Sequence, residues 1–133
     1  QLTNIARDVR EDLEMDRIYL PQDEMARFGC SEQDLRDGVL NQQFTDLMQF
    51  QAQRAQEYFR SGFKLLPYLS RRSRACPAVS GQLYCKILER IGDANYDVLH
   101  QRISLSKGEK LRVLVQTWLT STIPGLLRVP KGT

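Results

Sequence analysis

Apolar residues recur at steps of three and four along most of this 133-residue chain, which is the spacing of one face of an α-helix. The longest stripe follows Asn41 and keeps one face apolar for about six turns. Its members are Phe44, Leu47, Met48, Ala52, Ala55, Phe59, Phe63 and Leu66. Strand-like alternation never lasts beyond a few residues, with 102–106 the nearest case. The pattern therefore predicts an all-α helical bundle.

Capping residues and helix breakers predict where the first elements begin and end. A stripe of Leu2, Ile5, Val9 and Leu13 indicates an opening helix that packs through this face. Pro21 suits the start of a short helix and Gly29 its end. Ser31 with Asp34 three residues later has the pattern of a capping box, for another short helix that stops near Gly38.

Three longer helices are expected from Asn41 onward, with Asn41 as the N-cap of the first. Pro67 ends or kinks that helix. The basic run Arg71, Arg72 and Arg74 is predicted to be a solvated connection, and contact with phosphate or a membrane surface is the alternative.

The last two helices each have two candidate start residues and one apolar face. Pro77 or Ser80 opens the first of them, whose buried face would be Leu83, Ile87, Leu88 and Ile91. Ser104 or Ser106 caps the other, and its inward face would be Leu111, Leu114, Val115, Trp118 and Leu119. Pro124–Gly125 stops it. Residues 1–123 would then form one partial helical domain, followed by a flexible tail at 124–133.

Composition narrows the class of protein. An apolar content of 41% excludes a disordered chain, and a net charge of +3 spread among mixed signs gives no support for nucleic-acid binding. Three cysteines without a C-x-x-C pair favour a reducing, cytoplasmic setting over a disulfide framework or zinc site. No apolar run reaches the ~20 residues that span a bilayer. The first residue is Gln rather than Met, so we expect the chain to be a piece of a longer protein.

The first twelve residues carry the most informative polar pattern. Gln1, Asn4, Asp8 and Asp12 are spaced i, i+3, i+7 and i+11, which places them within a ~60° sector of one helical face. Two carboxylates at i, i+4 repel each other, and a shared cation removes that cost. Oxygen ligands without a nearby His or Cys favour Mg²⁺ over zinc or iron. The sole histidine, His100, is expected at the surface or a helix end.

The alternative for this pattern is an ordinary solvated helix face. An exposed D-x-x-x-D is common, and Arg7–Glu11 and Arg10–Glu14 have the spacing of simple ion pairs. The pattern alone therefore leaves a helical domain with a candidate cation site.

A longer match extends the pattern. The segment QLTNIARDVRED at 1–12, followed by RIYLP at 17–21, resembles the second aspartate-rich motif of the squalene/phytoene synthase family. Downstream, the segments at 38–41 and 44–47, YCKILERI at 84–91, NYD at 95–97, and Arg102, Lys107 and Lys110–Leu111 resemble later parts of the same family. The resemblance covers roughly residues 1–120, and it implies the carboxy-terminal half of an isoprenoid-synthase-type fold.

The resemblance assigns roles to the residues of the opening helix. Asn4, Asp8 and Asp12 would hold Mg²⁺, with Mn²⁺ as an alternative ion, and the metal would bridge a substrate diphosphate. Gln1 would lie on the same wall of the substrate site. Arg7 would supply positive charge near the diphosphate, unless it is engaged in an ion pair.

Four further residues would surround the diphosphate region by resemblance. Arg17 and Tyr19 would shape the mouth of the site and the loop over it. Tyr84 and Arg102 match positions that face the active site. The alternatives are a core aromatic for Tyr84 and a surface ion pair for Arg102.

The implied activity is the head-to-head condensation of two prenyl diphosphates with release of diphosphate. The leading hypothesis is a phytoene synthase-like transferase that uses two geranylgeranyl diphosphates. The alternative within the family is a squalene-, dehydrosqualene- or presqualene diphosphate-forming enzyme that uses two farnesyl diphosphates, with NADPH only in a reductive squalene synthase. Apolar faces around Phe44, Phe59 and Phe63 could line the lipid pocket, although ordinary core is the alternative for each.

The resemblance also predicts an incomplete site. Family members carry two aspartate-rich motifs, and this chain contains only the second. We therefore expect the 133 residues to be inactive alone, with an apolar face that the missing half or another chain covers. A non-catalytic helical relative would have lost the metal ligands, yet Asn4, Asp8 and Asp12 are intact. A basic RNA- or membrane-binding module would need a concentrated basic face, and the small positive excess of this chain is scattered. Peripheral membrane contact is still compatible with the sequence, because the product of the implied reaction is an apolar lipid.

Overall fold

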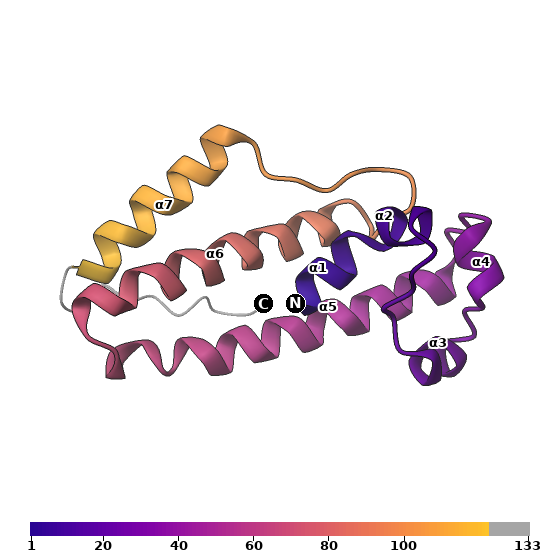
Figure 1. The fold of residues 1–133 in the computed structure, drawn as a ribbon, viewed down its shortest axis with the longest axis horizontal. Helices are drawn as coiled ribbons and strands as arrows, with labels where there is room; N and C mark the ends of the chain where they lie inside the picture. Colours follow the sequence, from indigo (N-terminus) through magenta and orange to yellow (C-terminus); the bar gives the residue numbers. More distant parts are fainter. Residues whose placement is uncertain (123–133) are drawn as a thin grey trace. The chain divides into compact units, whose positions relative to one another are not determined.

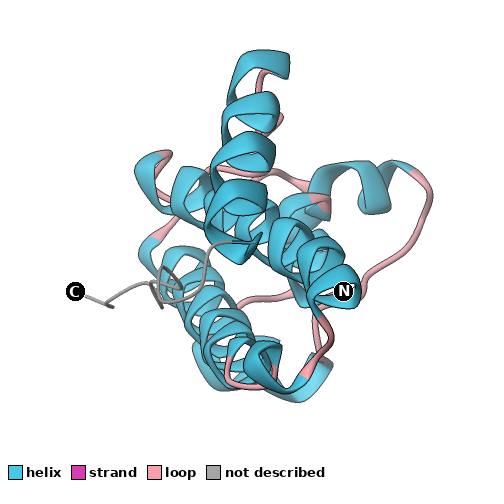
Figure 2. Cartoon of the chain, turned by 90° about the vertical axis from the view of Figure 1, so that its left-hand side faces the viewer, coloured by secondary structure: helices cyan, strands magenta, loops and turns pink. Residues whose placement is uncertain are grey.

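The computed structural model describes residues 1–122, without the side chains of residues 71, 72, 121 and 122. Within this part of the chain there are seven α-helices and one short 3₁₀ helix, and no strand (Figure 2). The predicted all-α class is confirmed. No described helix has both the length and the apolar character needed to cross a bilayer.

The described part of the chain divides into two compact units. The first comprises Gln1–Ala55 and Ile87–Ser104, and the second comprises Gln56–Lys86 and the described residues that follow Ser104. Two long helices, α5 (Gln42–Phe63) and α6 (Arg71–Asp93), contribute to both units.

The first unit opens with α1 (Leu2–Arg7) and α2 (Val9–Glu14), and a single continuous opening helix is therefore wrong. Asp8 separates the two, because its backbone leaves helical geometry at φ −99° and ψ 20°. Helical hydrogen bonds still flank the break: the Asp8 N–H donates to the Asn4 carbonyl at 2.8 Å, and the Asp12 N–H donates to the Asp8 carbonyl at 2.8 Å. The polar pattern thus lies on two helical segments that meet at Asp8.

The predicted packing stripe of this region is also partly wrong. Thr3, Ala6 and Val9 are the buried residues, whereas Leu2, Ile5 and Leu13 are only half-buried. Thr3 and Ala6 lie on α1 ahead of the break, so the buried face of α1 is a neighbouring face with smaller side chains. The stripe deduced from an unbroken period therefore does not coincide with the buried face.

The predicted short helices are confirmed as α3 (Gln22–Phe28) and α4 (Glu32–Arg36). Gly29 ends α3 in the left-handed region with φ 73°, where glycine carries no steric penalty. The capping box of α4 is complete: the Asp34 N–H donates to Ser31 Oγ at 3.0 Å, and the Ser31 N–H donates to Asp34 Oδ2 at 2.8 Å.

The core of the first unit is carried by α5 and the end of α6. Asn41 caps α5, as predicted, because its Oδ1 accepts the Phe44 N–H at 2.9 Å. The largest fully buried apolar side chains of the chain all belong to this unit: Phe44, Leu47, Met48, Leu88, Ile91 and Val98.

The second unit contains the end of α5, the 3₁₀ helix η1 (Leu66–Tyr68), the start of α6, and α7 (Lys107–Thr122). Its core is a cluster of Phe63, Leu66 and Ala78, with Phe59 and Cys85 packed against it. The predicted end of α5 near Pro67 is confirmed, and η1 connects α5 to α6 (Figure 1).

The predicted start of α6 is wrong. The helix begins at Arg71, so the arginine run belongs to its first turn and is not a connection. Ser70 provides the cap: its Oγ accepts the Ser73 N–H at 3.2 Å, and its carbonyl accepts the Arg74 N–H at 2.9 Å. Pro77 lies inside α6, where it removes one backbone donor.

The last helix, α7, has the predicted cap and an unexpected face. Ser106 and Glu109 exchange capping hydrogen bonds, with Glu109 N–H to Ser106 Oγ at 3.2 Å and Ser106 N–H to Glu109 Oε2 at 2.9 Å. The face predicted to point inward is instead 45% to 61% exposed along its whole length: Leu111, Leu114, Val115, Trp118 and Leu119. The predicted stop at Pro124–Gly125 and the tail at 124–133 lie outside the described residues.

Candidate functional site

The break between α1 and α2 places an arginine against the first aspartate. Arg7 holds the Asp8 carboxylate through two contacts, Nε to Oδ1 at 2.6 Å and Nη2 to Oδ2 at 2.7 Å. Both side chains are about 30% exposed, so this ion pair lies at the surface and not in the core. The pairing with Asp8 was not expected from the sequence, which favoured Glu11 as the ion-pair partner.

One turn earlier, the side-chain amide oxygen of Asn4 accepts no hydrogen bond within the described part of the chain. Its Oδ1 is buried and has no hydrogen-bond partner among the described residues. A buried carbonyl oxygen without a partner is costly, and such oxygens in native proteins usually have a ligand, ion or water to bind. An amide oxygen beside carboxylates is also a ligand type that a hard divalent cation accepts.

The surroundings of Asp12, the second aspartate of the motif, disfavour its charged form. Burial raises the pKa of Asp12, and the negative charge of Asp8 raises it further. The positive charge of Arg17 acts in the opposite direction, and Glu11 adds a smaller rise. The two motif carboxylates are therefore close enough to repel each other across the break. A cation bound between them would remove this repulsion.

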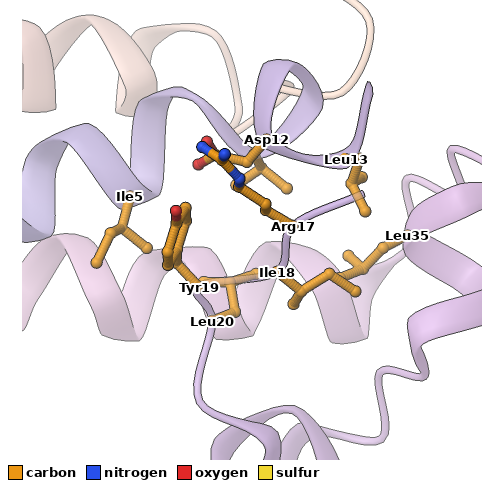
Figure 3. Close-up of a pocket in the computed structure, with 9 residues that line it drawn as sticks. Ile5, Asp12, Leu13, Arg17, Ile18, Tyr19, Leu20 and Leu35 are labelled. Carbon is orange, nitrogen blue, oxygen red and sulfur yellow. The ribbon is translucent and has the colours of Figure 1, made fainter. Parts of the chain in front are cut away.

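Asp12 lines a small hollow of about 200 Å³ within the first unit (Figure 3). The other lining residues come from α1, α2, the segment after α2, and α4: Ile5, Val9, Leu13, Arg17, Ile18, Tyr19, Leu20 and Leu35. Figure 3 shows the Arg17 side chain extending to the Asp12 carboxylate, with the Tyr19 hydroxyl on the same side. Most of the lining is aliphatic, and the polar groups at the hollow are those of Asp12, Arg17 and Tyr19.

Several lining residues were missed or given another role at the level of sequence. Ile5 and Leu13 were assigned to the packing face, yet they line the hollow. Leu35 reaches it from α4, and nothing in the motif spacing indicates that contact.

The remaining predicted site residues have different surroundings. Gln1 is exposed, and its carbonyl accepts the Ile5 N–H at 3.0 Å. Arg102 is 82% exposed and lies 3.5 Å, Nε to Oε1, from Glu11. Its geometry is that of a surface ion pair at the edge of α2.

Tyr84 belongs to the second unit, where it is half-buried. Its ring stacks on Phe59 with centroids 6.3 Å apart and planes 15° apart. This is the environment of a core aromatic, and its expected role toward substrate stays a prediction.

The candidate centre consists of two carboxylates and one amide. No group of three or more His, Cys, Asp or Glu side chains in the described part of the chain is arranged to hold a metal. Mg²⁺ usually binds through one or two carboxylates and completes its shell with water and substrate phosphate. The donor set Asn4, Asp8 and Asp12 fits that habit.

Residues 1–109 match the family model described as squalene/phytoene synthase, a span that includes every predicted site residue. The chain belongs to the squalene/phytoene synthase family. Its relatives include the 15-cis-phytoene synthase of Synechococcus elongatus, 43% identical over 92% of this chain and 40% of the relative. Phytoene synthase 2 of Solanum lycopersicum is 39% identical over the whole chain and 41% of its own length.

Solved structures agree with the family and its fold. A dehydrosqualene synthase in complex with ligand is similar with a TM-score of 0.78 and 29% identity, covering 88% of this chain and 41% of that structure. YisP from Bacillus subtilis is similar with a TM-score of 0.75 and 26% identity, covering 86% and 45%. The family's helical fold is therefore shared, and the chain spans about two fifths of the length of the curated relatives.

Proposed function

We propose that Asn4, Asp8 and Asp12 form one diphosphate-binding wall of an enzyme that joins two prenyl diphosphates head to head. The observation that carries the proposal is the set of oxygens at the α1–α2 break. Asn4 Oδ1 is buried without a partner, and the charge of Asp8 raises the pKa of Asp12. The unpartnered oxygen and the repulsion between the two carboxylates both destabilise the site without a cation. A bound cation would remove both costs.

Mg²⁺, or Mn²⁺ as an alternative, would be held by these three residues and would neutralise charge on a departing diphosphate. The chain's own cations would act beside it. Arg17 lies at the hollow next to Asp12, and Arg7 holds the Asp8 carboxylate in a fixed orientation. Fixed positive charge of this kind stabilises a leaving group without reorganisation during the reaction.

The preferred substrate is geranylgeranyl diphosphate, two molecules of which would give a phytoene-type product. Relatives named phytoene synthase, at 39% to 43% identity, support this choice. The dehydrosqualene synthase structure supports the alternative with two farnesyl diphosphates, at 29% identity. NADPH would be needed only for a reductive, squalene-forming reaction. Product analysis of a family-length protein that contains this chain, supplied with C15 and C20 diphosphates, distinguishes the two.

The proposed site needs further polypeptide, from the same or another chain. This chain spans about 40% of the length of its relatives. The exposed face of α7 supports the same proposal, because such a stripe normally packs against a partner. We expect no diphosphate release from prenyl diphosphates by residues 1–133 alone, and measurable release would contradict this expectation.

Peripheral membrane contact is a secondary proposal. A lipid surface is the alternative to a polypeptide as the cover of the α7 stripe, because the stripe begins next to Lys107, Lys110 and Arg112, and basic residues beside an exposed apolar face favour anionic lipid. Co-flotation with anionic but not neutral vesicles would support it, and no flotation with either would contradict it.

Titration calorimetry of Mn²⁺ into the chain, with and without inorganic diphosphate, tests the metal site. We expect Asp12→Asn and Asp8→Asn to weaken Mn²⁺ binding by about tenfold or more, since each removes one of two charged ligands. Asp16→Asn is the matched control, because Asp16 is an exposed aspartate just after α2 that pairs with Arg36. Equal Mn²⁺ affinity in all four proteins would overturn the ligand assignment.

A further inference from the structure

A half-buried acid on α3, Glu24, has no part in the site described so far. The Glu24 side chain is only 13% exposed, and its carboxylate accepts hydrogen bonds from Gln51 Nε2 and Arg54 Nη2, both on α5. Gln51 is itself 3% exposed. A charge in such a place is tolerated only when it is paired and hydrogen-bonded. The contact is therefore a specific attachment of α3 to α5, and the two helices lie side by side in Figure 1.

Aromatic rings extend this attachment. The Arg54 guanidinium lies 4.7 Å from the centre of the Phe50 ring, and Arg27 lies 5.3 Å from the same ring. Phe28 and Phe50 have centroids 5.4 Å apart. Cation–π contacts depend on direction as well as distance, so they fix the orientation of α3 in addition to burying it.

The segment that reaches the hollow is tied directly to α3. Pro21 is the N-cap of α3, its carbonyl accepts the Met25 N–H at 2.9 Å, and Leu20 is buried. At the other end, the Arg17 N–H donates to the Asp12 carbonyl at 2.8 Å. Only residues 18–20 lie between these anchors, so a displacement of α3 would be passed along the chain toward Tyr19 and Arg17.

We propose that Glu24 is a positioning residue for the diphosphate site. By attaching α3 to Gln51 and Arg54, it holds Arg17 and Tyr19 at the hollow beside Asp12. Glu24 does not touch the ligand, and its effect passes through Arg17. The inference deepens the proposed function and rests on it. The proposal predicts that the affinity for metal depends on α1 and α2 alone. The affinity for diphosphate would depend in addition on the attachment of α3 to α5.

The test uses a family-length protein that contains this chain, with Mn²⁺ alone and then inorganic diphosphate at saturating Mn²⁺. We expect Glu24→Gln to raise the Kd for diphosphate about fivefold or more while the Kd for Mn²⁺ stays within about twofold. Arg17→Ala should weaken diphosphate binding at least as much. The double variant should be no weaker than Arg17→Ala, because both changes remove one interaction. Asp23→Asn, an exposed acid on the same turn, is the control that should bind normally.

Three results would overturn the proposal. These are unchanged diphosphate affinity in a folded Glu24→Gln chain, an equal loss of Mn²⁺ affinity, and additive losses in the double variant. Arg54→Gln replaces Glu24→Gln if the latter does not fold, because Arg54 is the more exposed partner.

A ligand-free measurement separates this proposal from the proposed function. Amide hydrogen exchange at Arg17 and Met25, whose N–H groups donate to the Asp12 and Pro21 carbonyls, should accelerate in Glu24→Gln, while exchange at residues 9–14 stays as in the wild type. If the wild-type family-length protein binds neither Mn²⁺ nor diphosphate, the proposed function fails, and the exchange data still decide whether Glu24 holds this segment. Unchanged exchange at Arg17 and Met25 overturns the positioning role whatever the binding data show.

Discussion

The two units of the chain differ in how far their large apolar residues are covered. In the first unit, large side chains such as Phe44, Met48 and Ile91 are less than 2% exposed. In the second, the α7 stripe is about half exposed, and Tyr68 is 87% exposed. An amphipathic pattern predicts which face of a helix packs against a partner, but it does not identify that partner. The candidate site lies in the unit whose core is closed, where packing can hold ligands in fixed positions.

Truncation of one large residue in each unit gives the strongest test of this contrast. Phe44→Ala should lower the free energy of unfolding by about 3–5 kcal/mol, because it leaves a cavity in a closed core. Leu114→Ala should change it by no more than about 0.5 kcal/mol, because this side chain is already half exposed. Urea denaturation followed by circular dichroism at 222 nm measures both values. Similar losses would mean that α7 is covered in solution.

A glycine tests whether the smaller core of the second unit is tightly packed. A Cβ added at Gly81 would lie 2.5 Å from Phe63 Cε1 and 2.8 Å from its Cζ. Gly81→Ala should therefore cost about 1–3 kcal/mol despite the better helix propensity of alanine. Its control is Gly108→Ala on α7, where a Cβ meets nothing within 4 Å.

The control should be neutral or stabilising by up to about 1 kcal/mol in the same urea measurement. If Gly81→Ala behaves like Gly108→Ala, the Phe63 ring moves aside and the cluster is loosely packed.

Helix ends that depend on local hydrogen bonds could be predicted from the sequence. Ser31 with Asp34, Asn41, and Ser106 with Glu109 each cap within three residues, so the neighbouring sequence contains all the information needed. The start of α6 was mispredicted because Pro77 was taken as a first-turn signal. The Ser70 cap and the rest of α6 instead accommodate the one donor that Pro77 lacks.

In the candidate site, too, features set by neighbouring residues could be predicted, whereas contacts between residues far apart in the sequence could not. Spacing identified Asn4, Asp8 and Asp12 as a group, and family resemblance gave that group a chemical role. Spacing could not predict the break at Asp8, because a change of backbone angle at one residue depends on how both segments pack. Leu35 at the hollow and the attachment of Glu24 to Gln51 depend on contacts across tens of residues, which no local pattern encodes.

The smallest expected effect concerns pH and compares the two capping boxes. Hydrogen bonds from the Ser31 side chain and backbone hold the pKa of Asp34 below its ordinary value. Since the folded pKa lies below the unfolded value of about 3.9, the stabilisation is fully present above pH 3.9 and is lost as pH falls through the folded pKa. The gap in urea midpoint between wild type and Asp34→Asn should therefore be visible at pH 6 and shrink in acid.

The corresponding change in the second unit is Glu109→Gln. It removes the acid that caps a helix with an exposed apolar face, so we expect it to fray the first turn of α7 without moving the main unfolding transition. Faster amide exchange at residues 107–110, with an unchanged urea midpoint, would fit that picture. A shift in midpoint as large as that of Asp34→Asn would mean that α7 unfolds together with the closed core, and the contrast between the two units would then be one of surface rather than of stability.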